Sequence, residues 1–221
     1  KKTIYAKVTY ADIAGLEGSS AKSGISGSLL NQLTQMDGFV HVVRCFPAAN
    51  VPHLAGGVNP LRDIAAMDAE LLLNDLIAVE RKQERLAEER KKGGGRDRAL
   101  IDREVALFEK LAASLAREEP LRLLDLSLEE ERLLSGFGFL TRKPVLLLLN
   151  LSEGQEPPAV EYASTRSRLV ALQGKLEMDI CQLPADEAEV FMAEYGIQEL
   201  GLLKVIHLSY ELLGLQSFFT V

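Results

Sequence analysis

Apolar and polar positions along the chain follow two different periods. Residues 4–10 alternate and are rich in β-branched and aromatic side chains, which predicts a strand. Residues 38–46 are mostly apolar, and residues 145–149 form an uninterrupted apolar run, VLLLL. Both of these apolar segments predict strands that are buried on both faces, as in a parallel sheet that helices cover.

The middle of the chain has the period of amphipathic helices. From residue 61 to about residue 92, apolar side chains recur mostly every three or four positions, and the same period returns over residues 101–115. A polar, glycine-rich segment at residues 91–97 separates the two stretches. We therefore expect two long helices joined by a tight turn, which is an antiparallel helical hairpin.

Shorter helices are predicted on both sides of this hairpin. They cover residues 29–36, a segment that begins at Ser127, and residues 186–195 and 200–213. Ser127 and Glu130 have the spacing of a capping box, and the last two segments are each followed by glycine. Residues 166–172 are only weakly patterned, so no element is predicted there. The fold class is α/β, with a mostly parallel sheet flanked by helices and an inserted helical hairpin.

Composition narrows the class of protein. The chain has 221 residues, of which 47% are hydrophobic, and this is enough for a substantial core. Its net charge is −7, so no overall attraction to nucleic acid or to an anionic membrane is expected. No signal peptide and no apolar run of membrane-spanning length are present, which predicts a cytoplasmic protein without membrane contact. Cys45 and Cys181 lie in apolar runs and are expected to be buried thiols.

A D-x-x-G motif at residues 12–15 follows the first predicted strand. In P-loop hydrolases, the aspartate of such a motif orders Mg²⁺, usually through a water. The glycine N–H meets the γ-phosphate, where a side chain would clash. Asp12 and Gly15 are therefore candidates for the phosphate end of a nucleotide site. An ordinary strand-to-loop turn is the alternative interpretation of these four residues.

Residues 150–153 (NLSE) directly follow the apolar run, at a strand end where parallel folds bind ligands. The Asn150 amide has the groups to donate to a purine N7 and to accept from the adenine amine. A guanine site would favour aspartate at the fourth position, and Glu153 is one methylene longer. The loop therefore favours relaxed or adenine-leaning base choice. The alternative is an Asx turn with a solvated glutamate.

A third candidate is the small loop predicted at residues 172–177 (LQGKLE), which includes Gln173, Gly174 and Lys175. The backbone of such a loop can pack against a purine, although an ordinary loop has the same appearance. The three motifs occur along the chain in the order found in GTPase-like domains.

Several segments resemble the YchF (Obg-like) ATPases, a family in the P-loop GTPase superfamily. These segments are DIAGL at 12–16, HVVRCF at 41–46, VNP at 58–60, FLTRKP at 139–144, NLSE at 150–153 and LGLQSFFT at 213–220. They extend over nearly the whole chain.

The resemblance implies a partial G domain in residues 1–58 and 142–216, an inserted coiled-coil-like arm in residues 59–141, and the start of a TGS domain at residues 217–221. It implies that the complete protein binds ATP or GTP with Mg²⁺ and hydrolyses it, and that ATP binds at least as well as GTP. The nucleotide-binding residues that it implies are Asp12, Gly15, Asn150, Leu151, Glu153, Gln173, Gly174 and Lys175. Leu16 takes the place of the water-orienting glutamine of most GTPases, which implies slow or partner-dependent hydrolysis.

The chain departs from the family pattern in two places. It contains no G-x-x-x-x-G-K-[ST] loop, which in the family lies upstream of these residues. We therefore expect a fragment, or a protein that lost the loop, and a segment that is inactive by itself. Residues 17–28 also differ from the glycine- and lysine-rich switch of the family, although Lys22 and some of the glycines are retained.

The predicted hairpin has a basic tip. Residues 81–98 contain eight basic and four acidic side chains, which gives a local net charge of +4 in an acidic chain. The residues closest to the turn are Lys91, Lys92, Arg96 and Arg98. Such a tip can contact RNA phosphates, and the family is associated with ribosomes. A solvated helical face with i,i+4 ion pairs is the alternative.

Two functions from different classes follow from these residues. The first is an ATP/GTP hydrolase of YchF type that associates with the ribosome or with RNA. The second is a non-enzymatic RNA- or ribosome-interaction module built on a G-domain scaffold that has lost nucleotide binding. The sequence gives no indication of the oligomeric state.

Overall fold

A computed structural model describes residues 6–13, 25, 27–53, 55–92 and 95–216. The chain divides into two compact units. We name them the sheet unit (residues 1–11, 38–64 and 144–221) and the arm unit (residues 12–37 and 65–143).

The sheet unit is built on three parallel strands in the order β1-β2-β3. They are β1 (Phe39–Arg44), β2 (Val145–Asn150) and β3 (Ser167–Leu172). Strands β1 and β2 confirm the predictions from residues 38–46 and 145–149. Strand β3 was not predicted. The prediction that β1 is buried on both faces is wrong, because Val42 is 58% exposed.

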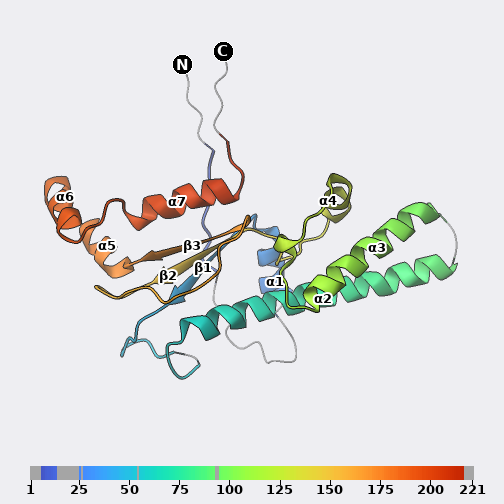
Figure 1. Cartoon of the computed structure of the whole chain (residues 1–221), viewed down its shortest axis with the longest axis horizontal. Helices are drawn as coiled ribbons and strands as arrows, with labels where there is room; N and C mark the ends of the chain where they lie inside the picture. Colours follow the sequence, from blue (N-terminus) through green and yellow to red (C-terminus); the bar gives the residue numbers. More distant parts are fainter. Residues whose placement is uncertain (1–5, 14–24, 26, 54, 93–94, 217–221) are drawn as a thin grey trace, which may run out of the picture. The chain divides into compact units, whose positions relative to one another are not determined.

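Side chains of β2 alternate between two apolar layers. Leu147 and Leu149 pack with Val43, Cys45 and Ile64 on one face of the sheet. Leu146 and Leu148 point to the other face. There they meet the apolar stripe of helix α7 (Gly201–Leu212), which lies along the sheet in Figure 1. Strand β2 is buried from both sides for this reason, as its unbroken apolar run predicts.

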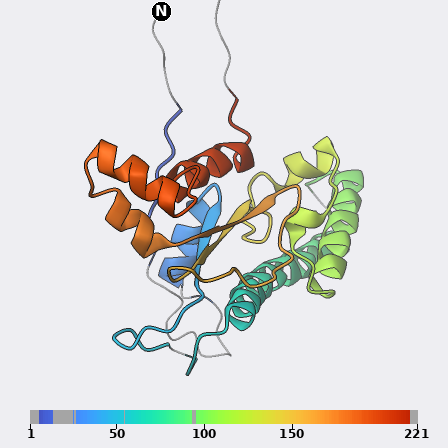
Figure 2. The ribbon, with the colours of Figure 1, turned by 60° about the vertical axis from the view of Figure 1, so that its left-hand side comes forward.

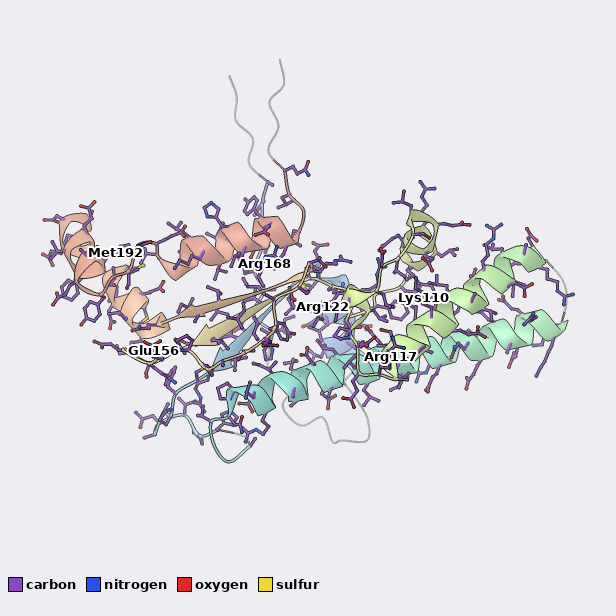
Figure 3. All side chains as sticks on the ribbon, in the orientation of Figure 1. Lys110, Arg117, Arg122, Glu156, Arg168 and Met192 are labelled. Carbon is purple, nitrogen blue, oxygen red and sulfur yellow. The ribbon has the colours of Figure 1, made fainter. Side chains whose placement is uncertain are left out.

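Three helices follow β3 in the sheet unit. They are α5 (Gly174–Ile180), α6 (Ala185–Glu194) and α7, drawn from orange to red in Figure 2. The last two confirm the helices predicted at 186–195 and 200–213. Gly196 and Gly214 follow them with φ of +65° and +67°, the left-handed conformation that ends many helices. Arg168 of β3, labelled in Figure 3, forms an ion pair with Glu211 of α7.

The predicted loop at residues 172–177 is wrong over most of its length. Leu172 ends β3, Gln173 is the N-cap, and α5 begins at Gly174. Lys175 lies one turn before Asp179 and pairs with it at 3.1 Å, an i,i+4 contact that supports a helix. Ile180 is the buried residue of this short helix.

The arm unit contains the helical hairpin. Its elements are α1 (Gly27–Gln35), most of α2 (Pro60–Lys92), α3 (Arg98–Leu115), the 3₁₀ turn η1 (Leu121–Leu123) and α4 (Leu128–Leu134). Helices α2 and α3 run side by side in Figure 1, and the α/β fold class with an antiparallel hairpin arm is confirmed. The capping box of Ser127 and Glu130 is also confirmed.

An apolar core joins the helices of the arm unit. Its buried members include Val79, Leu86, Phe108, Leu111 and Leu134. Ion pairs flank this core. Lys82 of α2 pairs with Glu104 of α3 at 2.7 Å, and Lys110, labelled in Figure 3, pairs with Glu130 of α4 at 3.1 Å.

A buried carboxylate fixes the segment that returns from the arm. Asp75 of α2 is 2% exposed. It accepts hydrogen bonds from the Leu140 N–H at 2.8 Å, from the Thr141 N–H at 2.7 Å and from the Thr141 hydroxyl at 2.6 Å. Burial raises the pKa of Asp75, and these hydrogen bonds oppose the rise. The three donors compensate for the burial of this group.

Two further predictions are corrected. Residues 6–10 form no strand, because they pair with no other strand within the described ranges. They approach α7 instead, where the Tyr10 hydroxyl donates to the Ser209 hydroxyl at 2.9 Å. Cys181 is exposed rather than buried, since its neighbour Ile180 takes the inward position at the end of α5. Within the described part of the chain, no helix is both long enough and apolar enough to cross a membrane.

Candidate functional site

The candidate site lies at the carboxyl end of the parallel sheet. Strands β2 and β3 end side by side at Asn150 and Leu172. The Leu151 N–H donates to the Leu172 carbonyl oxygen at 2.9 Å, so the pairing continues one residue past β2. The loop after β2 and the start of α5 are thereby held next to each other. Loops at this end of a parallel sheet bind ligands in many α/β folds.

The Asn150 side chain has a fixed orientation. Its Oδ1 accepts a hydrogen bond from the Gly174 N–H, at 3.2 Å. Its Nδ2 is therefore the end that remains to donate to a ligand, and the second lone pair of Oδ1 remains to accept. Gly174 is required for this contact, because a Cβ at that position would lie 2.9 Å from Oδ1.

A second hydrogen bond joins the same two segments. The Gln173 Oε1 accepts from the Gly154 N–H at 3.2 Å. Gly154 has a φ of +68°, which non-glycine residues rarely adopt, so the loop turns here by means of glycine. Asn150, Gln173 and Gly174, which we predicted from separate motifs, are therefore brought together in the structure.

Glu153 is exposed and has a partner from another helix. The carboxylate accepts a hydrogen bond from the hydroxyl of Tyr195, which follows α6, and this contact raises the pKa of the Tyr195 phenol. The negative charge of Glu153 opposes the phenolate and acts in the same direction. The carboxylate is thus partly engaged. Lys175 points to Asp179, and its side chain is 82% exposed.

Two residues that support the site were not predicted. Gln155 accepts from the Ser152 N–H at 3.0 Å and donates to the Cys45 carbonyl oxygen at 2.7 Å, so it joins the loop to the end of β1. Glu177 of α5 accepts from the Gly201 N–H at 2.5 Å and thereby caps α7. Neither long-range contact has a local sequence signal, because Cys45 is 110 positions from Gln155 and Gly201 is 24 positions from Glu177.

The D-x-x-G motif lies mostly outside the described residues. Asp12 is described and exposed. Gly15 and Leu16 belong to the residues that the structure does not describe, as do the predicted TGS residues 217–221. The roles assigned to them remain predictions.

The basic residues near the tip of the hairpin divide into two groups. Lys92 pairs with Glu88 at 3.3 Å, and Arg96 pairs with Glu89 at 2.9 Å and also with Glu104. Lys91 and Arg98 are exposed and form no ion pair within the described ranges. One i,i+4 pair of the alternative interpretation, Lys92 with Glu88, is therefore present, and Arg96 has more distant acidic partners. Two of the four cations remain for a partner.

Known proteins with similar sequences support the resemblance to the YchF family. The chain is 34% identical over 231 residues to the ribosome-binding ATPase YchF of Bacillus subtilis (strain 168). It is 36% identical over 228 residues to the protein of the same name from Escherichia coli O157:H7. Each alignment covers 100% of this chain and 62% of the relative. No protein-family model matches the chain.

A solved structure of a protein with the same family name has a similar fold. The Schizosaccharomyces pombe YchF GTPase matches this fold with a TM-score of 0.72 at 26% identity, over 89% of this chain and 55% of that one. The chain thus spans somewhat more than half of the proteins that it matches. The resemblance to the YchF (Obg-like) ATPases, a family of P-loop GTPases, is therefore confirmed for this chain.

Proposed function

We propose that this chain carries the base-binding part of a YchF-type ATP/GTP hydrolase. The observation that carries the proposal is the Asn150 amide, which the Gly174 N–H orients at the carboxyl end of a parallel sheet. In this proposal residues 1–58 and 142–216 are a partial G domain, residues 59–141 are its inserted arm, and residues 217–221 begin a TGS domain. The names of the relatives, ribosome-binding ATPase and GTPase, support the same class of activity.

The base is contacted by Asn150 in the proposed complex. Its Nδ2 donates to the purine N7, and the free lone pair of Oδ1 accepts from the adenine amine. Leu151 and the backbone at Gln173, Gly174 and Lys175 surround the ring. Glu153 is partly engaged by Tyr195, and its side chain is one methylene longer than the aspartate of a guanine site, so we expect ATP to bind at least as well as GTP.

The phosphates and Mg²⁺ belong to the other end of the nucleotide. Asp12 fits such a site because it is an exposed carboxylate, and Mg²⁺ in nucleotide sites takes one or two carboxylates and keeps several waters. Bound Mg²⁺ would neutralise charge on the phosphates. Gly15 leaves room for the γ-phosphate. Leu16 has no group that orients water, so hydrolysis in the complete protein is slow or depends on a partner.

Most affinity for a triphosphate comes from the backbone N–H groups of a phosphate-binding loop. Because residues 1–221 contain no such loop sequence, we expect weak nucleotide binding and no hydrolysis by this segment alone.

A ribosome or RNA contact is proposed for the tip of the arm. Lys91 and Arg98 are its best candidates, whereas Lys92 and Arg96 are neutralised in part by glutamates. Reversing the charge at Lys91 and Arg98 should weaken cosedimentation with ribosomes more than reversal at Lys92. Each phosphate contact that is lost should lower the salt slope of binding by about 0.7–0.9. Unchanged ribosome binding of the Lys91/Arg98 variant at low salt would remove the tip assignment.

The base assignment is tested by calorimetry on the full-length gene product with ATP and GTP. Asn150→Ala should weaken ATP binding about tenfold, the value of one hydrogen bond of about 1.4 kcal/mol. Gln198→Ala is the control, since Gln198 is an exposed amide outside these loops. Equal affinity in the Asn150 and Gln198 variants would overturn the base assignment. A full-length protein that binds neither nucleotide would favour the non-enzymatic interaction module.

A further inference from the structure

Helix α6 presents an apolar surface that the fold does not use. None of its residues is buried, although it is ten residues long and carries large apolar side chains. Val190 is 65% exposed and Phe191 is 40% exposed. Phe191 stacks on Tyr195, with ring centroids 6.2 Å apart and ring planes 7° apart. Figure 3 labels Met192 on the same helix.

The apolar side chains border a shallow depression. Val190 and Phe191, together with Asp186 and Glu187 one turn earlier, line a hollow of about 340 Å³. We name the surface formed by these four residues and Tyr195 the α6 face. Singly exposed apolar residues are common in soluble proteins, whereas here two neighbouring apolar side chains border one hollow and one of them stacks on a second aromatic ring.

The segment that carries this face, between Lys175 and Lys204, has charge of one sign. Residues 176–203 contain seven acidic side chains and no lysine, arginine or histidine. Four of the seven lie on α6, at Asp186, Glu187, Glu189 and Glu194. None of these four forms an ion pair within the described residues. The face therefore combines apolar contact area with carboxylates that have no cation of their own.

This charge selects among possible occupants. RNA and anionic lipid are repelled, because both present phosphates. A second copy of the chain in a two-fold contact would bring the same carboxylates against each other. A basic amphipathic segment satisfies both features, since its apolar residues fill the hollow and its lysines or arginines meet the carboxylates.

We propose that the α6 face is the docking site for a basic amphipathic helix of another protein. The partner places an apolar side chain between Val190 and Phe191 and pairs its cations with Asp186 and Glu187. The contact needs neither Asn150 nor a bound nucleotide, although Tyr195 belongs to the α6 face and also donates to Glu153 of the loop after β2. It is also separate from the tip of the arm, which carries charge of the opposite sign.

The test uses the full-length gene product and a fluorescent helical peptide of about 18 residues, long enough to form a helix. The peptide contains leucine on one face and lysine on the other, and binding is followed by anisotropy. A peptide of equal charge with serine in place of leucine is the probe control. The leucine peptide should bind at least about tenfold more tightly than the serine peptide.

Three variants locate the contact. Val190→Ser with Phe191→Ser should weaken binding about tenfold, and both side chains are exposed enough for the fold to remain. Asp186→Lys with Glu187→Lys should weaken it by a similar factor and reduce its salt dependence. Leu128→Ser is the matched control, because Leu128 is 80% exposed and precedes three glutamates on α4. That control should bind as the wild type does, and circular dichroism checks the fold of each variant.

Four results would overturn the proposal. The first is equal binding by the Val190/Phe191 variant and the Leu128 variant. The second is equal binding of the leucine and serine peptides. The third is a dimer in sedimentation that the Val190/Phe191 change dissociates, which would assign the face to a second copy. The fourth is tighter binding of single-stranded RNA through α6 than of the peptide.

Discussion

A buried carboxylate of the arm unit and two amides of the sheet unit are held in opposite ways. In the arm unit, Asp75 is almost inaccessible and accepts three short hydrogen bonds of 2.6–2.8 Å. In the sheet unit, Asn150 and Gln173 are half-buried and each accepts one bond of 3.2 Å. Charge-assisted bonds are short and strong, and neutral ones are longer and weaker. The first arrangement fixes a fold, whereas the second orients groups that can still bind a ligand.

The comparison predicts its largest effect at Asp75. Asp75→Ala should destabilise the protein by about 3 kcal/mol, because two buried N–H groups and a hydroxyl lose their acceptor. Urea unfolding followed by circular dichroism measures this value. The control is Asp102→Ala, which removes an exposed pair with Arg90 and should cost less than about 1 kcal/mol. Similar losses for the two variants would contradict the distinction between the units.

A smaller effect is expected at Gly174. In Gly174→Ala, the new Cβ would lie 2.9 Å from Asn150 Oδ1, so the two loops must separate. We expect a destabilisation of about 1–2 kcal/mol and a loss of nucleotide affinity that matches Asn150→Ala. Gly136→Ala is the control, since nothing lies within 4 Å of its Cβ position. Unfolding curves measure the loss of stability, and calorimetry on the same samples measures the nucleotide affinity. Unchanged affinity would mean that Gly174 does not support the nucleotide site.

Acid should weaken the arm through Glu104. Burial by itself would raise the pKa of Glu104, but the hydrogen bonds and charges of Lys82 and Arg96 outweigh it and lower the pKa below its usual 4.5. A lowered native pKa adds stability above pH 4.5, and this stability is lost as the pH falls through the native value. Glu104→Gln should cost about 1 kcal/mol at pH 7, and its stability should approach that of the wild type as the pH falls below 4.5 and through the lowered native pKa.

The exposed ion pair of Arg117 and Glu119 is the control for the pH dependence at Glu104. Arg117 lowers the pKa of Glu119, and Glu119→Gln should leave unfolding unchanged at each pH because the pair is open to solvent. Stability measured in urea between pH 3 and pH 7 tests both variants. Parallel curves for Glu104→Gln and the wild type would show that the buried pair contributes nothing.

The smallest effect is expected at Tyr195. Tyr195→Phe releases the Glu153 carboxylate without changing a buried contact, so stability should change by less than about 0.5 kcal/mol. The free carboxylate should improve GTP binding relative to ATP by about two- to threefold. Competition between the two nucleotides in the full-length protein measures the ratio. An unchanged ratio would mean that Glu153 does not face the base.

Much of the fold is visible in the sequence where local and tertiary signals agree. The run at residues 145–149, the helical period of residues 61–92 and the capping box at Ser127 each correspond to an observed element. Strand β3 was missed because Ser167 and Arg168 interrupt its apolar pattern. The strand predicted at residues 4–10 has alternation but no pairing partner among the described residues, and a strand requires both.

The sequence predicted residues of the candidate site, but it did not predict the contacts between them. Asn150 has a recognisable position at the end of an apolar run, whereas Gln173 and Gly174 were predicted only from their residue types and their order along the chain. The hydrogen bond between Asn150 and Gly174 depends on parallel pairing of β2 with β3, which no local pattern reveals. Asp75 shows the same limit, because an aspartate within an amphipathic helix looks solvated until its partners, 65 residues away, are known.

The hydrogen bond between Glu177 and the Gly201 N–H connects the start of α7 to the helix that Asn150 contacts. Asn150 bonds to the first residue of α5, and Glu177 of the same helix bonds to the first residue of α7. Helix α5 is thereby bonded at its first residue and again about one turn later, at the fourth of its seven residues. Deuterium uptake at the Gly201 amide should therefore slow when a molecule immobilises the Asn150 amide, although the two residues are 51 positions apart in the chain.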